Sequence, residues 1–139
     1  MILNRTDSAV QSRLEREAAA NPVVAVVSAA IDSVTEAFEI AEDGSGLEIV
    51  ARAPLANGVA NRARMKLFSP KPGHTLIFFY KRSLVPYSRD RYSYGGLDLR
   101  SAEVAPEEIT GWLEFLSSGF HPDKRPAKLR RAFPYEIPE

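Results

Sequence analysis

The feature that most constrains the fold is a series of short segments between residues 38 and 80 in which apolar residues recur at every second position. Residues 62–68 alternate most cleanly. A period of two residues is the repeat of a β-strand, because successive side chains of a strand point to opposite faces of a sheet. The turn-forming segments 43–46 and 69–73 separate these runs, and such short turns join neighbouring strands as hairpins. The sequence therefore predicts an antiparallel meander.

The pattern predicts up to five strands. The segment 75–80 is apolar at both even and odd positions, which indicates the central strand of the sheet, buried on both faces. The last segment contains Gly95 and Gly96, where a bulge or a close approach of another backbone is expected. The predicted strands are residues 38–41, 47–53, 62–68, 75–80 and 92–100.

Helices are predicted before and after these strands. From Ser8, apolar residues recur every four positions, and Asn21-Pro22 then provides a helix cap followed by a proline at the first helical position. Residues 22–35 are rich in valine and would also suit a buried strand, so helix and strand both stay open there, with the cap favouring helix. Residues 105–119 form the last predicted helix. Its apolar stripe consists of Ile109, Trp112, Leu113 and Leu116.

The expected architecture is a single α+β domain spanning residues 1–139. A helical part, 1–36, precedes a mostly antiparallel sheet of four or five strands, 37–100, and the helix 105–119 packs on that sheet. An extended tail, 120–139, contains four prolines, which forbid long regular structure. The sequence leaves open whether this tail docks on the domain or on a partner.

Few residues could carry catalytic or metal chemistry. The chain has no cysteine and only two histidines, His74 and His121, and it shows no phosphate-binding loop or nucleophile elbow. We therefore expect no cofactor, no metal site and no enzyme, with an enzyme centred on His74 as the remote alternative. The N-terminus has no apolar run of the kind found in a signal peptide, and no segment is long enough to span a membrane, so a cytoplasmic protein without a membrane partner is expected.

The charge is strongly segregated although the net charge is zero. Residues 1–61 contain four basic and nine acidic residues, whereas residues 62–100 contain nine basic and two acidic residues. Residues 101–120 carry four glutamates and no basic residue, and the tail is weakly basic. This asymmetry predicts an acidic partner, unless the acidic helices simply cover the basic strands. The basic tail could in the same way clamp the acidic helix 105–119.

The basic and aromatic residues between 62 and 100 predict a binding surface. The leading hypothesis is a small non-enzymatic binding or adaptor protein that engages an acidic protein partner, because aromatic residues and arginines dominate protein interfaces. The residues expected to carry this binding are Arg82, Tyr87, Arg89, Arg91 and Tyr92. The alternative is a single-stranded nucleic-acid platform, in which cations bind phosphates and rings stack on bases. That platform would use Arg62, Arg64, Lys66, Tyr92 and Tyr94. The partner's identity and the oligomeric state stay open.

Overall fold

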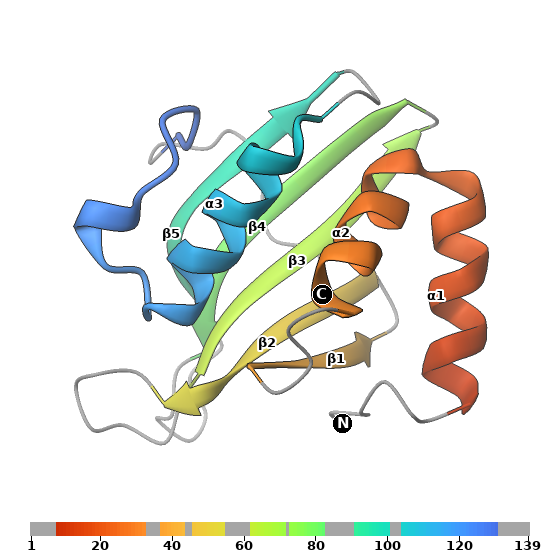
Figure 1. Ribbon diagram of the computed structural model, residues 1–139, viewed down its shortest axis with the longest axis horizontal. Helices are drawn as coiled ribbons and strands as arrows, with labels where there is room; N and C mark the ends of the chain where they lie inside the picture. The colour runs from red at the N-terminus through yellow and green to blue at the C-terminus, as the bar shows by residue number, and fades with distance from the viewer. Residues whose placement is uncertain are drawn as a thin grey trace.

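The structure is a computed structural model that describes residues 8–32, 37–43, 46–54, 62–71, 73–82, 91–100 and 104–130. Within these residues, two helices are followed by five strands and a third helix (Figure 1). The elements are α1 (Ser8–Ala20), α2 (Pro22–Asp32), β1 (Phe38–Asp43), β2 (Gly46–Pro54), β3 (Arg62–Lys71), β4 (His74–Arg82), β5 (Arg91–Leu99), α3 (Pro106–Ser117) and the short 3₁₀ helix η1 (Pro122–Lys124). The predicted α+β architecture is confirmed.

The strands form one antiparallel sheet in the order β1-β2-β3-β4-β5, which is the predicted meander. The middle strand is β3, so the prediction that residues 75–80 form the central strand is wrong by one place. Both faces of β4 are nevertheless buried: Ile77 and Phe79 point into the main core, and Phe78 and Tyr80 belong to a second apolar cluster on the opposite face. This burial explains why residues 76–80 of β4 are apolar at both even and odd positions.

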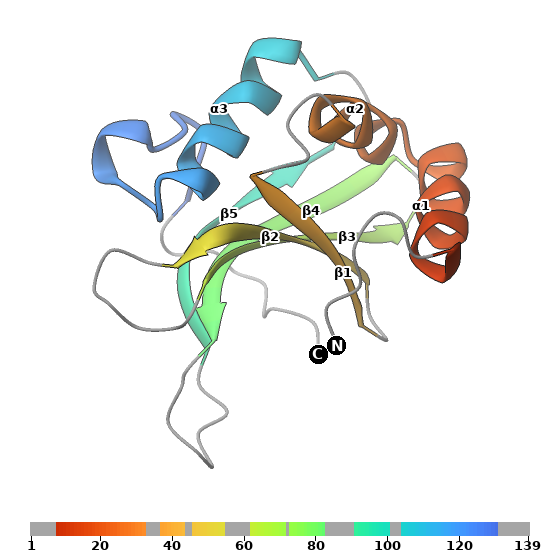
Figure 2. The same ribbon diagram turned by 60° about the horizontal axis from the view of Figure 1, so that its bottom comes forward.

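All three helices lie on the same face of the sheet (Figure 2). The core fills the space between the helices and this face, and it includes the alternate β3 residues Ala63, Met65 and Leu67. Five residues of α3 are buried, among them the whole predicted stripe. The burial of apolar surface between the helices and the sheet is the main favourable contribution to the free energy of folding.

A buried asparagine explains why the valine-rich segment forms a helix. The Asn21 side-chain oxygen accepts a hydrogen bond of 3.0 Å from the backbone N–H of Val23 and so caps α2. The Asn21 amide nitrogen donates to the Thr75 hydroxyl at 2.9 Å. One side chain therefore starts the helix and ties it to β4, and the open choice between helix and strand is settled as helix.

Strand β5 contains the irregularity expected at its two glycines. The register with β4 shifts between Phe79 and Tyr80, and Gly95 has a φ of +134°, a conformation that favours glycine. Gly96 exchanges two backbone hydrogen bonds of 3.0 Å with Arg130, so the first part of the tail pairs with β5. The expected close approach of another backbone is confirmed.

The described part of the tail docks on the domain. Phe120 and Leu129 are buried in the main core. The Lys128 ammonium donates to the Glu108 carboxylate at 2.9 Å, which is one ion pair of the kind predicted between the basic tail and the acidic helix α3. The tail beyond residue 130 lies outside the described residues. Along the described chain, no helix is long and apolar enough to cross a membrane.

Candidate functional site

The predicted basic residues of β3 lie on the face of the sheet that carries no helix. Arg62, Arg64 and Lys66 alternate with the residues of β3 that point into the helix-side core, as predicted. The acidic helices cover the other face (Figure 2). The helices therefore do not cover these basic residues of β3. The acidic residues that pair with them belong to the sheet itself.

A buried polar cluster surrounds Glu48 on this helix-free face. One carboxylate oxygen of Glu48 accepts a hydrogen bond of 3.0 Å from Nη1 of Arg64, and the other accepts from the Tyr80 hydroxyl. Glu48 is 1% exposed, and Tyr80 and Lys66 are 0% exposed. Lys66 lies directly opposite Glu48 in the β2–β3 register, and Nε of Arg64 is buried without a hydrogen-bond partner. Arg64 and Lys66 therefore belong to an internal network.

Arg62 is also paired within the sheet. Its Nη1 lies 3.0 Å from one carboxylate oxygen of Glu39, and Nη1 of Arg52 lies 2.9 Å from the other. A carboxylate held between two guanidinium groups neutralises much of the local positive charge. Arg62, Arg64 and Lys66 thus provide a weaker cationic surface than their spacing predicts.

The end of the β4–β5 hairpin differs from this arrangement. Arg82 lies directly opposite Arg91, and the neighbouring pair is Lys81 and Tyr92. We call these four residues the basic hairpin end. The other two predicted residues of this region, Tyr87 and Arg89, lie outside the described residues.

Tyr94 does not share a face with the β3 cations. Its ring stacks on Phe120 with centroids 4.3 Å apart, on the helix side of the sheet. Asp98, in contrast, lies opposite Leu76, which belongs to the cluster on the helix-free face. The bulge beside Gly95 therefore places Tyr94 and Asp98 on opposite faces of the sheet.

The two histidines form local contacts. Nε2 of His74 lies 2.6 Å from Oδ1 of Asp98, which links the start of β4 to the end of β5, and the His74 side chain is 9% exposed. Hydrogen bonds from Arg100 and then from His74 hold the pKa of Asp98 below its usual value, against the opposing effect of burial. His121 accepts a hydrogen bond from the backbone of Asp123 and caps η1. Among the described residues, no group of three or more His, Asp or Glu could hold a metal ion.

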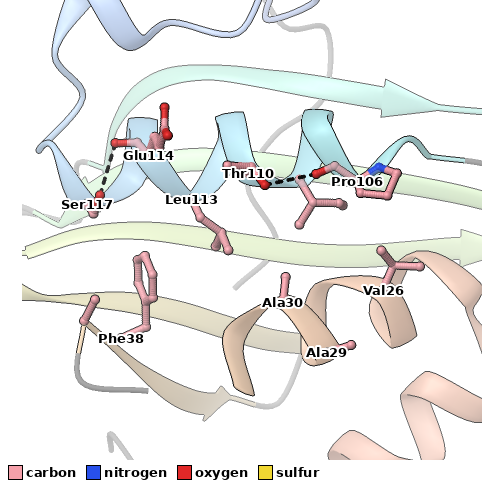
Figure 3. A pocket seen from close by; sticks show the side chains of 11 residues that line it. Val26, Ala29, Ala30, Phe38, Pro106, Thr110, Leu113, Glu114 and Ser117 are labelled. Carbon is pink, nitrogen blue, oxygen red and sulfur yellow. Dashed lines mark hydrogen bonds between the residues drawn. The ribbon is translucent and has the colours of Figure 1, made fainter. Parts of the chain in front are cut away.

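The structure also contains a groove that the sequence did not reveal. It has a volume of about 660 Å³ and lies between α2, α3 and the start of β1 (Figure 3). Buried Phe38, Ile109 and Leu113 line it, and the small side chains of Ala29 and Ala30 on α2 leave it open. The feature of the sequence that could have indicated this groove is the pair of small residues Ala29 and Ala30, which lie across the groove from the larger side chains of α3.

The chain matches no protein-family model, no curated protein and no solved structure. Its function must therefore be inferred from the surfaces described above. Two of these are candidate binding surfaces, namely the basic hairpin end and the groove between α2 and α3.

Proposed function

We propose that this protein is a non-enzymatic binding or adaptor protein whose basic hairpin end engages an acidic protein partner. The observation that carries the proposal is the register of β4 and β5, which sets Arg82 directly opposite Arg91. Lys81 in the next pair adds a third basic residue. A cluster of basic residues attracts a partner that carries the opposite charge.

The surroundings of the basic hairpin end support this partner. Residues 81–92 contain four basic residues and one acidic residue. Figure 2 shows the end of β4 and the start of β5 turned away from the helix layer, which carries the glutamates of α3. The acidic helix α3 therefore lies away from this end of the hairpin.

A protein partner is favoured over single-stranded nucleic acid. A nucleic-acid platform needs cations and exposed rings on the same face. Here Arg64 is bound to Glu48, Lys66 is buried, and Tyr94 lies on the opposite face, already stacked on Phe120. The remote alternative of an enzyme centred on His74 is not favoured either, because little of that side chain is open to a substrate.

The proposal is tested by fluorescence anisotropy with two labelled probes. One is an acidic peptide of glutamate and tryptophan, and the other is a single-stranded oligonucleotide of similar charge. The wild-type protein is expected to bind the peptide, more weakly at about 200 mM than at about 50 mM salt, because screening weakens exposed ion pairs. The R82E/R91E variant should raise the Kd about tenfold or more, which corresponds to about 1.4 kcal/mol.

A charge-matched control separates the hairpin end from net charge alone. Lys71 and Lys124 are exposed and lie away from the hairpin end, so K71E/K124E changes the net charge by the same amount. This control should bind the peptide like the wild-type protein. Equal losses in both double variants, or no peptide binding at low salt, would refute the proposal. Binding of the oligonucleotide alone would establish the nucleic-acid alternative.

A further inference from the structure

We propose that the groove between α2 and α3 is a second docking site, which accepts an amphipathic helix with apolar residues on one face and lysine or arginine beside them. This site goes beyond the proposed function, because it lies in the helix layer and prefers the opposite charge. Its volume of about 660 Å³ falls within the range of roughly 300–1,000 Å³ that is typical of sites for small apolar groups. Several side chains of a docked helix can enter it.

The walls of the groove offer few hydrogen bonds to a polar ligand. The Thr110 hydroxyl donates to the Pro106 carbonyl at 3.2 Å, and the Ser117 hydroxyl donates to the Glu114 carbonyl at 3.2 Å (Figure 3). Both hydroxyl protons are therefore used within α3. The rest of the lining is mostly alanine, valine and larger apolar side chains. A sugar or nucleotide would lose hydrogen bonds to water there without replacing them, whereas an apolar side chain would gain.

The backbone of the walls selects a helix over an extended peptide. Both long walls are α-helices, whose N–H and C=O groups are bonded within each helix apart from the ends. The two helical walls therefore offer an extended peptide no row of unpaired backbone groups, and β1 adds only its first residues to the groove, so most of the peptide's own backbone would lack partners. A helix satisfies its backbone internally and presents only side chains, at positions i, i+3, i+4 and i+7.

The charge around the groove selects the residues that flank the apolar face. Neither α2 nor α3 contains a lysine, arginine or histidine, and the acidic residue among those that line the groove is Glu114. Glu114 lines the groove itself and is exposed. No ion pair of the Glu114 carboxylate is found in the part of the chain that the structure describes. A basic residue on the docked helix would supply that partner.

The test uses three labelled peptides of about 14 residues, close to the shortest length at which helices are stable. The first has leucines in an i, i+3, i+4, i+7 pattern with lysines elsewhere. The second keeps the leucines and replaces lysine by glutamate. The third is a scrambled version of the first. Binding is measured on the R82E/R91E variant, whose hairpin end should not attract the glutamate peptide, and this variant is expected to bind the first peptide at least about tenfold more tightly than either of the others.

Variants of the groove identify the site. Ala29 is exposed, so A29W should fill the groove without disturbing the core and weaken binding of the first peptide at least about tenfold. E114K should weaken that peptide several-fold and strengthen the glutamate peptide. E107K is the matched control: the same charge change on the same helix, at a residue that does not line this groove, should leave both affinities unchanged.

Several results would overturn the proposal. These are no binding of the leucine–lysine peptide, equal binding of its scrambled version, or binding that A29W leaves unchanged. Sedimentation of the free protein tests another occupant, since a dimer that A29W dissociates would assign the groove to a second copy of this chain. R82E/R91E should not change peptide binding to the groove, so failure of this proposal and failure of the proposed function are distinguishable.

Discussion

Three glycine-to-alanine substitutions should change stability by different amounts and with different signs. Gly95 combines a φ of +134° with crowding: an added Cβ would lie 2.8 Å from Cγ of Leu129 and 2.9 Å from the carbonyl oxygen of Arg130. Gly73 has a φ of +78° but no atom within 4 Å of an added Cβ. Gly111 lies inside α3 with neither constraint. The series therefore separates backbone strain from steric overlap.

The magnitudes follow from these differences. G111A should stabilise the protein by about 0.5–1 kcal/mol, because alanine loses less conformational entropy in a helix. G73A should destabilise it by about 1 kcal/mol, the cost of a left-handed backbone less a gain from the stiffer unfolded chain. G95A should cost about 3–5 kcal/mol, since strain of about 1–3 kcal/mol adds to displacement of Arg130, whose two hydrogen bonds to Gly96 are worth about 0.5–1.5 kcal/mol each.

Urea unfolding followed by the fluorescence of Trp112 measures all three variants. Trp112 is the one tryptophan of the chain and is 4% exposed in α3, so its emission should shift on unfolding. The order of stability should be G111A, wild type, G73A and G95A. If G95A were as stable as G73A, the contact between Gly95 and the tail would not exist in solution. A destabilised G111A would contradict the helical environment of that residue.

Further predictions concern the polar clusters of the sheet. E48A should destabilise the protein by about 3–5 kcal/mol, because it leaves the charge of Arg64 buried without a partner. Y80F removes one hydrogen bond to a charged group and should destabilise it by about 1.5–3 kcal/mol. Equal urea midpoints for the two variants would contradict this ranking. Because Arg100 and His74 lower the folded-state pKa of Asp98, this residue contributes stability above its unfolded-state pKa, and the contribution disappears as the pH falls through the lower folded-state value, below about pH 4. D98N should therefore unfold with a weaker pH dependence in that range, and an unchanged acid profile would exclude this role.

The helices and strands could be predicted because local patterns determine them. Alternation in residues 62–68 placed Ala63, Met65 and Leu67 toward the core, and the structure buries all three. Asn21 was recognised as a cap because its side chain acts on a residue only two positions away. The clamp between the tail and α3 followed from opposite charge, which is seen in the pair Lys128 and Glu108.

The site could not be predicted in the same way because it depends on register between strands. Glu48 is a single acid in the apolar run 47–51, and nothing local shows that it faces Arg64 and Tyr80. The register of β2 and β3 also shifts between Val50 and Pro54, so counting residues does not give the pairs. In β5 one bulge moves Tyr94 to the helix side, which separates it from the cations it was grouped with.

The sheet pairs explain how a chain of zero net charge can keep two surfaces of opposite sign. Glu39 and Glu48 pair with Arg62 and Arg64 of β3, and two further basic residues of the sheet, Arg82 and Arg91, lie at the end of the β4–β5 hairpin. The glutamates of α3 lie in the helix layer, away from both groups of cations, and of these Glu108 is paired with the tail. If the separation of acidic and basic segments along the sequence served only to hold the helices against the strands, the acidic residues of α3 would face the basic residues of β3. The structure places them on opposite sides of the sheet, and this separation favours two binding surfaces of opposite charge.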